Sequence, residues 1–158
     1  MSKSELEVTK NKILDGSISI FQPKKGFRVS IDSILLSSSI KEYSKCMEFG
    51  TGSGIIIIYL SKKFPNSKII GVEKNIELVK LANKNLLKNN INNINSKILC
   101  NDLFNKPFLQ EYNNKLDRVI MNPPYFISNN VIKSNNKFKA SARYESNINE
   151  WFEAAYKK

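Results

Sequence analysis

The stretch Lys45–Gly54, KCMEFGTGSG, decides the fold of this chain. An apolar run that can form a strand leads into three glycines at alternate positions. The next segment, Ile55–Phe64, has helical character and ends at Pro65. Glycine lets the backbone turn tightly and approach a ligand closely, and in open α/β sheets ligands bind beyond the carboxyl ends of the strands. The stretch therefore predicts a strand, a glycine turn and a helix, with a ligand at the turn.

Apolar runs on both sides of this stretch repeat the alternation of strand and helix. Strands are predicted at Lys68–Glu73, Ser96–Cys100 and Leu116–Met121, and helices at Ile31–Ile40, Asn75–Asn90 and Asn147–Tyr156. Strands that alternate with helices form a parallel sheet through right-handed crossovers, with helices on its faces. We therefore predict an α/β fold of the Rossmann-like type, with a doubly wound and mainly parallel sheet. Residues 1–158 are expected to form one domain, in which residues 1–44 are an N-terminal cap segment.

Carboxylates follow two of the predicted strands. Glu73 ends the strand after the glycine turn, and Asp102 follows the next strand. The first can accept hydrogen bonds from both hydroxyls of a ribose, and the second can accept one from the amino group of an adenine. The glycine spacing differs from the dinucleotide fingerprint, and the absence of Gly-Lys-Ser/Thr excludes a phosphate-binding P-loop. These residues indicate a nucleoside cofactor, and the alternative is a structural turn beside solvated acids.

A proline turn, Asn122-Pro123-Pro124-Tyr125, directly follows the fourth predicted strand. The two prolines stiffen the backbone and remove two N–H donors. The side-chain carbonyl of Asn122 and the backbone carbonyl of Pro123 can then both accept from one –NH2 group. An amine held in this way has its lone pair free for in-line attack on a methyl group, and Tyr125 can stack on a flat target. The alternative is a proline turn that only caps the strand.

The composition of the chain limits which binding partners and which cellular location we expect. The 158-residue chain has a net charge of +11, no histidine and two cysteines. A basic surface attracts polyanions such as nucleic acid, although A/T-rich coding would produce the same excess of lysine. No apolar run reaches the ~20 residues that span a bilayer, and Met1–Lys12 lacks the apolar stretch of a signal peptide, so we expect a cytoplasmic protein with no membrane contact. Cys46 and Cys100 are expected to be reduced core residues, and no metal site is expected.

The glycine turn, the acid at the strand end and the proline turn together resemble the amino-group methyltransferases that use S-adenosylmethionine. The segment Phe21–Leu36 is similar to the segment before the glycine turn in the bacterial valine-tRNA adenine-N(6)-methyltransferase family. Ala142–Glu145 is also similar to that family, although Tyr144 stands where many relatives carry histidine, so this segment is given no catalytic role. The similarity runs from about Phe21 to Ala155.

The resemblance implies roles for individual residues. S-adenosylmethionine would be held by the glycine turn and the two strand-end acids, namely Gly50, Gly52, Gly54, Glu73 and Asp102. Arg28 and Asp32 would line the cofactor pocket near its methionine end, whereas Asn122, Pro123 and Tyr125 would hold the target amine.

The resemblance also implies a reaction, the transfer of a methyl group to the exocyclic amine of adenine in tRNA. The proline turn is shared with enzymes that methylate DNA adenine, guanine amino groups or protein glutamine, so rRNA guanine and protein glutamine remain alternative substrates. A non-catalytic RNA-binding remnant of the fold is a third possibility. The family sheet has further strands, and without them Leu116–Met121 would be an exposed apolar edge. We therefore expect that the chain is truncated after its fourth strand and the following helix.

Overall fold

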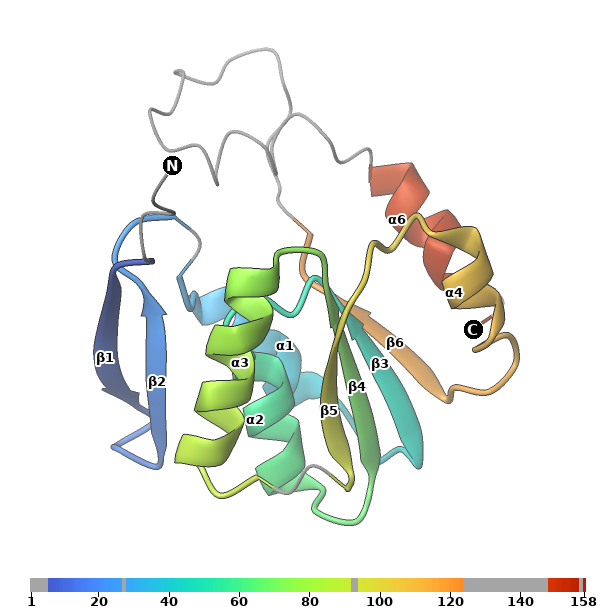
Figure 1. Ribbon diagram of the computed structural model, residues 1–158. Helices are drawn as coiled ribbons and strands as arrows, with labels where there is room; N and C mark the ends of the chain where they lie inside the picture. The colour runs from blue at the N-terminus through green and yellow to red at the C-terminus, as the bar shows by residue number, and fades with distance from the viewer. Residues whose placement is uncertain (1–5, 27, 92–93, 124–147, 157) are drawn as a thin grey trace, which may run out of the picture.

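The computed structural model describes residues 6–26, 28–91, 94–123, 148–156 and 158 (Figure 1). Its centre is a parallel sheet of four strands in the order β5-β4-β3-β6. The strands are β3 (Lys45–Phe49), β4 (Lys68–Glu73), β5 (Ser96–Cys100) and β6 (Arg118–Met121). All four were predicted from the apolar runs, with β6 beginning two residues later than expected. The predicted Rossmann-like, doubly wound sheet is confirmed.

Helices cover both faces of this sheet (Figure 1). The helices α1 (Ile31–Ser39), α2 (Ile55–Lys63) and α3 (Ile76–Lys88) pack on one face, and α4 (Lys106–Gln110) and α6 (Ile148–Ala155) pack on the other. The run of isoleucines at the start of α2 is completely buried, as expected for a helix between a sheet and other helices. Helix α3 begins where the sequence indicated, because the side chain of Asn75 accepts a hydrogen bond from the N–H of Glu77. The short helix α4 was not predicted.

An antiparallel hairpin precedes the sheet and was also not predicted. Its strands are β1 (Val8–Ile13) and β2 (Ile18–Pro23), which pair along their whole length. The chain reverses at Leu14, Asp15 and Gly16, all of which have positive φ. Within residues 1–44, where a cap segment was expected, the structure describes this hairpin and then α1, and the cap role stays a prediction.

Two buried asparagines of α3 attach this hairpin to the rest of the domain. The amide of Asn85 accepts from the N–H of Phe21 and donates to its carbonyl, both at 2.7 Å. The amide of Asn89, one helical turn later, makes the same pair of bonds to Ser19 at 3.0 and 2.7 Å. The two side chains thus replace a neighbouring strand along the free edge of β2. Asn85 also donates to the carbonyl of Ser53 in the glycine turn, at 2.8 Å.

The last strand and the cysteines test two further expectations. Within the described residues, β6 pairs only with β3, so it is an edge strand of the sheet as expected. Cys46 is buried, and burial raises the pKa of its thiol to about 12. Cys100 is exposed, so the expectation that both cysteines lie in the core was wrong for this residue. It is the last residue of β5, which lies at an edge of the four-stranded sheet and pairs there with Glu73 of β4. In the part of the chain that the structure describes, no helix combines the length and the apolar character needed to cross a bilayer.

Candidate active site

The carboxyl ends of the four parallel strands lie along one edge of the sheet (Figure 1). Each end is followed by residues that the sequence analysis selected. In the spatial order β5, β4, β3 and β6, these are Asp102, Glu73, the glycine turn 50–54 and Asn122. The topology therefore brings together residues that are up to 72 positions apart in the sequence, from Gly50 to Asn122.

The glycines of the turn serve different purposes. All three have a positive φ, of 71° at Gly50, 56° at Gly52 and 87° at Gly54. A Cβ on Gly50 would lie 2.8 Å from the ring of Trp151 of α6, and one on Gly54 would lie 3.2 Å from Ala82 of α3. Among the described residues, a Cβ on Gly52 would meet no atom within 4 Å. The outer two glycines therefore permit close packing, whereas Gly52 lies under open space in which a ligand can approach the backbone.

The carboxylate of Glu73 contacts this turn directly. One of its oxygens accepts a hydrogen bond from the N–H of Gly52 at 3.0 Å, and the other accepts from the N–H of Asn75 at 2.9 Å. A carboxylate oxygen can accept more than one hydrogen bond, so each still has capacity for a hydroxyl donor. The half-buried Glu73 thus combines a fixed orientation with access from the open side of the turn.

A second acid, Glu48, contacts the glycine turn through Thr51. This residue was given no role by the sequence analysis. It is only 2% exposed and accepts a hydrogen bond from the hydroxyl of Thr51 at 3.2 Å. Burial raises its pKa well above the ordinary value, and the neighbouring charge of Glu73 raises it further. Thr51 in turn fills the space over Gly71, where any Cβ would collide with Thr51 and Ile57. The signal available in the sequence was an acid inside an otherwise apolar strand.

Asp102 lies at the β5 end of the edge. Its side chain is exposed, and one carboxylate oxygen accepts from the N–H of Phe104 at 2.9 Å. The preceding Asn101 donates its N–H to the carbonyl of Glu73 at 3.1 Å, which holds the loop against the end of β4. The two acids predicted for one cofactor are therefore next to each other, on neighbouring strand ends.

Asn122 lies at the other end of the edge, directly after β6. Its side-chain nitrogen donates to the hydroxyl of Ser33 in α1 at 3.1 Å. This bond orients the amide, since the carbonyl oxygen of the side chain then points away from Ser33. Pro123 follows and is buried. Tyr125, also predicted to hold the target, lies outside the described residues, as does the segment Ala142–Glu145.

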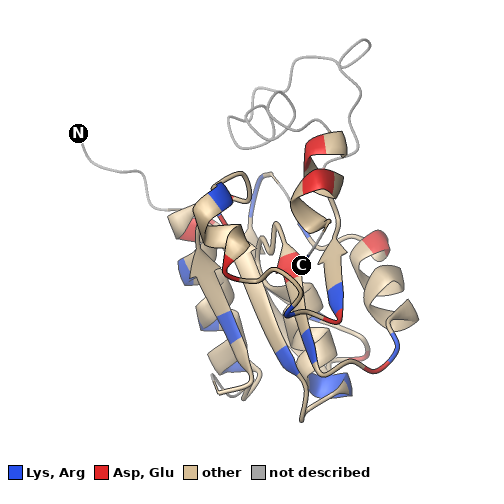
Figure 2. Cartoon of the chain, turned by 90° about the vertical axis from the view of Figure 1, so that its right-hand side faces the viewer, with Lys and Arg blue, Asp and Glu red and all other residues tan. Residues whose placement is uncertain are grey.

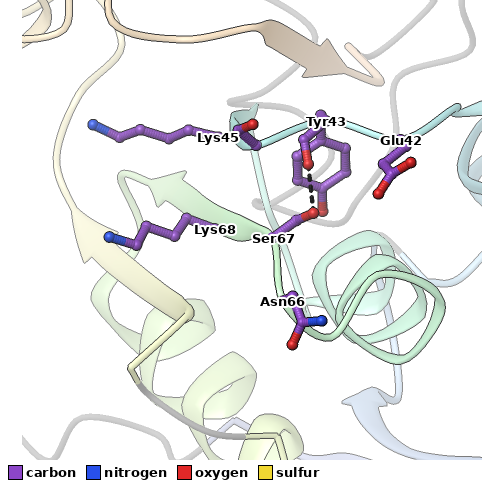
Figure 3. Close-up of a pocket in the computed structure, with 7 residues that line it drawn as sticks. Glu42, Tyr43, Lys45, Asn66, Ser67 and Lys68 are labelled. Carbon is purple, nitrogen blue, oxygen red and sulfur yellow. Dashed lines mark hydrogen bonds between the residues drawn. The ribbon is translucent and has the colours of Figure 1, made fainter.

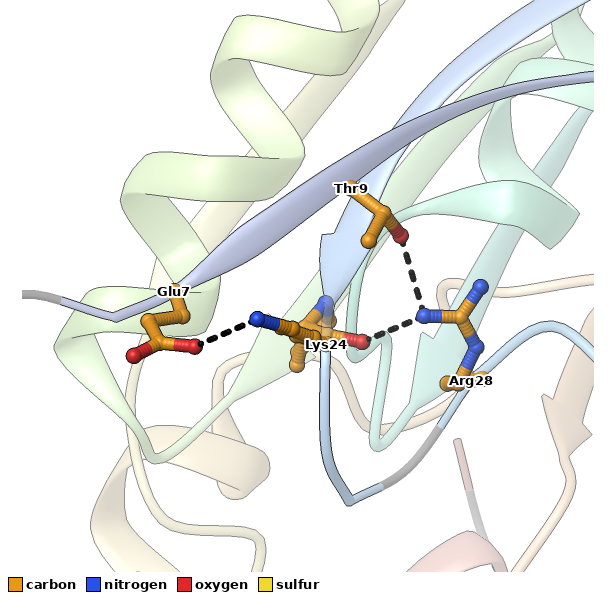
Figure 4. Close-up of polar contacts among 5 residues, drawn as sticks. Glu7, Thr9, Lys24 and Arg28 are labelled. Atoms are coloured by element: carbon orange, nitrogen blue, oxygen red, sulfur yellow. Dashed lines mark hydrogen bonds and ion pairs between the residues drawn. The ribbon is translucent and has the colours of Figure 1, made fainter.

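Arg28 is bound to the hairpin. Its guanidinium donates to the hydroxyl of Thr9 at 2.9 Å and to the carbonyl of Pro23 at 2.8 Å (Figure 4). A further bond of 3.3 Å reaches the side chain of Asn11. Asp32 is exposed in the first turn of α1, one residue before Ser33. The structure thus engages Arg28 with β1 and β2, and the cofactor roles of Arg28 and Asp32 stay predictions.

An open hollow of about 540 Å³ lies at the opposite, amino end of the sheet (Figure 3). The segments 42–45 and 66–68 line it, and Lys45 and Lys68 extend in parallel along one side. These two lysines are directly paired in the register of β3 and β4. None of the candidate site residues that the structure describes lines this hollow.

Residues 27–145 match the protein family described as methyltransferase small domain. A tRNA1(Val) (adenine(37)-N6)-methyltransferase from Flavobacteriaceae bacterium is 31% identical over 68% of this chain and 46% of its own length. A bifunctional methyltransferase from Rickettsia felis is 29% identical over 78% of this chain and 21% of its own length. A Methanocaldococcus jannaschii protein, named for N5-glutamine methyltransferase activity, is 36% identical over 60% of this chain and 44% of its own length. The chain spans about half or less of the length of these relatives.

Solved structures share the fold. An S-adenosylmethionine-dependent methyltransferase from Agrobacterium tumefaciens superposes with a TM-score of 0.57 over 78% of this chain and 41% of its own, at 13% identity. A precorrin-6y C5,15-methyltransferase from Geobacter metallireducens superposes with a TM-score of 0.54 over 65% of this chain and 53% of its own, at 21% identity.

Proposed function

Because this chain belongs to the methyltransferase small domain family, and has the fold of methyltransferases that use S-adenosylmethionine, we propose that it transfers a methyl group from this cofactor to the exocyclic amine of adenine in tRNA. One observation carries the proposal. Two acids, an open glycine turn and an oriented asparagine lie side by side, in this spatial order, along one edge of the sheet. An extended nucleoside cofactor laid along that edge would meet them one after another.

The residues at the first three strand ends fit the cofactor. Asp102 is exposed and can accept from an adenine amino group, and Glu73 can accept from the ribose hydroxyls. The open space over Gly52 leaves room for the rest of the molecule to cross the turn. The bound cofactor supplies an electrophilic methyl group on a positively charged sulfur. With adenosine over β5 and β4, its methionine end would cross β3 toward Asn122.

Asn122 acts on the amine. The carbonyl oxygen of its side chain accepts one hydrogen of the –NH2 group, and the backbone carbonyl of Pro123 accepts the other. The lone pair of the nitrogen would then be directed at the methyl carbon that the cofactor supplies. Formation of the nitrogen–carbon bond would release the cofactor as a neutral thioether, and the methylated amine would lose one proton to water. Positioning and preorganised acceptors account for the rate in this scheme.

Two findings favour tRNA as the substrate. Relatives in Flavobacteriaceae bacterium and in Vibrio campbellii are named as tRNA1(Val) adenine-N6 enzymes. The chain also has 25 lysines and arginines against 14 acids, and its basic residues are distributed over several elements (Figure 2). A positive surface attracts the phosphate backbone of RNA and speeds its association.

Protein glutamine is the second candidate, because the Methanocaldococcus jannaschii relative is named for that activity. The experiment is a methyl-transfer assay with labelled S-adenosylmethionine and two substrates, unmodified tRNA and a glutamine-containing protein. We expect label in tRNA, and N6-methyladenosine after digestion to nucleosides. Label only in the protein would replace the tRNA proposal with the glutamine one, and label in neither would contradict both.

A further inference from the structure

A group of lysines surrounds the contact between the N-terminal hairpin and α3. Lys10 and Lys12 are exposed on β1, and they pair directly with Phe21 and Ser19 of β2. Directly paired residues lie on the same face of a hairpin. The Nζ of Lys84 lies 4.3 Å from the ring centre of Phe21, and Lys88 is exposed one helical turn later. We call the surface of Lys10, Lys12, Phe21, Lys84 and Lys88 the hairpin–helix face.

The acids of these elements leave the face strongly positive. Glu7 lies 3.3 Å from the amine of Lys24, and Glu77 lies 2.9 Å from the amine of Lys80, so both are paired with other lysines (Figure 4 shows the first pair). The remaining acid of the hairpin is Asp15, in the turn. The hairpin–helix face has four exposed lysines, and the hairpin adds one exposed acid, Asp15. This excess of positive charge favours binding of a polyanion.

The backbone under this face is fixed. The carbonyl and N–H groups of Ser19 and Phe21 are held by the amides of Asn89 and Asn85, which are 7% and 0% exposed. Buried polar groups that are all satisfied rigidify the elements they join. The lysines thus extend from a preformed surface and do not depend on binding to bring their backbones together.

The same asparagine joins this face to the site. Asn85 donates to the carbonyl of Phe21 at 2.7 Å and to the carbonyl of Ser53 in the glycine turn at 2.8 Å. The side chain of Asn85 therefore contacts both β2, which carries Phe21, and the glycine turn at which we place the cofactor. An RNA held on the hairpin–helix face would lie beside the edge of the sheet where methyl transfer is proposed.

We propose that the hairpin–helix face binds the phosphate backbone of the RNA substrate, an inference that rests on the proposed tRNA methylation. Lysine ammonium groups bind phosphate as point charges, so the contacts carry affinity and register but no base specificity. The lysines at the amino end of the sheet, Lys45 and Lys68, have similar charge but line the hollow on the far side from the proposed chemistry. They provide the matched control.

The experiment compares two double variants, Lys10→Gln with Lys84→Gln, and Lys45→Gln with Lys68→Gln. Binding of unmodified tRNA is measured over a range of salt concentrations, with S-adenosylhomocysteine binding and thermal unfolding as checks on the fold. Each lost phosphate contact should reduce the slope of log affinity against log salt by about one. We expect the Lys10→Gln/Lys84→Gln variant to lower that slope by about two and to weaken tRNA binding at low salt. The Lys45→Gln/Lys68→Gln control should keep the wild-type slope and affinity.

Three results would overturn the inference. Normal tRNA binding by the first pair would show that the face makes no contact, and an equal loss in both pairs would show that only total charge matters. Both outcomes leave the methylation proposal intact. A wild-type protein that binds S-adenosylhomocysteine but no tRNA at low salt would contradict the RNA substrate itself, and the face with it.

Discussion

The amino and carboxyl ends of the central sheet differ in their surface shape and in the side chains that they present. The amino end has an open hollow of about 540 Å³, a pair of parallel lysines and a buried tyrosine, Tyr43, whose pKa is raised by burial. The carboxyl end has glycines at positive φ, two acids and an asparagine oriented by a hydrogen bond. Every residue selected from the sequence for chemistry and described by the structure, apart from Arg28 and Asp32, lies at a strand end on the carboxyl side. The comparison shows that the residues selected from the sequence gather at the carboxyl end, whereas the described hollow lies at the amino end.

The acids at the two ends differ in the same way. At the amino end, Asp117 accepts hydrogen bonds from the N–H groups of Lys45 and Ser44, both at 2.7 Å, and these bonds lower its pKa. These contacts attach the start of β6 to the start of β3. At the carboxyl end, Glu73 contacts the backbone of the turn while remaining accessible from the open side. The first acid joins two strands of the sheet, and the second is the acid that we propose to bind the cofactor.

The largest difference between the two ends should appear in turnover. Asn122→Ala removes the proposed acceptor for the target amine, and methyl transfer to tRNA should fall by about 10²-fold or more, as for the loss of one preorganised polar contact. Binding of S-adenosylhomocysteine by calorimetry should stay nearly normal, because the glycine turn is unchanged. Lys68→Gln at the amino end is the control and should keep wild-type turnover. Equal activity in the two variants would make the proline turn a structural feature only.

The second largest difference between variants at the two ends of the sheet should appear in cofactor affinity. Glu73→Ala removes the proposed ribose acceptor and the contact with the N–H of Gly52. Calorimetry should show S-adenosylhomocysteine binding weakened at least tenfold, or about 1.4 kcal/mol. Asp117→Asn at the amino end should leave that affinity unchanged. Tight NAD binding in place of S-adenosylhomocysteine would show that the cofactor is misassigned.

A smaller effect is expected from Ser33, whose hydroxyl accepts a hydrogen bond from the side chain of Asn122. Ser33→Ala should lower kcat about tenfold, with little change in cofactor affinity, because the amide of Asn122 loses its orienting bond. Ser33→Thr, which keeps a hydroxyl, should recover most of the activity. Ser37→Ala is the matched control, since that buried hydroxyl donates to the backbone carbonyl of Ser33 at 2.6 Å and its removal leaves the hydroxyl of Ser33 in place. If Ser33→Ala had no effect in an enzyme that depends on Asn122, the orienting role would be wrong.

The smallest effect concerns pH and Glu48. Its folded-state pKa lies above the ordinary value of 4.5, so burial favours the neutral carboxyl. The stability this gives is fully present below the unfolded pKa and is lost as pH rises toward the folded pKa. Between about pH 5 and pH 8, wild-type Tm should therefore fall relative to that of Glu48→Gln, whose amide cannot ionise. Parallel Tm curves for the two proteins would show that the acid is ionised without cost.

Local sequence was enough to predict the sheet and most of its helices. Apolar runs bounded by glycine, asparagine and proline predicted all four strands of the sheet, and the helix predicted from Asn75 corresponds to α3, of which Asn75 is the N-cap. The hairpin was missed because β1 is polar and largely exposed, although Asp15-Gly16 is a turn signal that could have indicated it. Helix α4 is five residues long and too short to show a helical period.

The contacts within the site were less predictable. The bond between Asn122 and Ser33 joins residues 89 positions apart, and no local pattern indicates such a pairing. Asn85 and Asn89 were given no role by the sequence analysis, because their bonds to β2 exist only once the hairpin lies beside α3. Sequence analysis could therefore place residues at strand ends, but it could not say which side chains orient them.

The most direct test of the central claim is nucleoside mass spectrometry of tRNA from cells that lack the gene for this protein. The cells would be complemented with the wild-type gene or with the Asn122→Ala gene. The account predicts that N6-methyladenosine in one tRNA disappears without the gene, returns with the wild type and stays absent with the variant. Unchanged N6-methyladenosine in the tRNA of cells without the gene, or full restoration by Asn122→Ala, would contradict it.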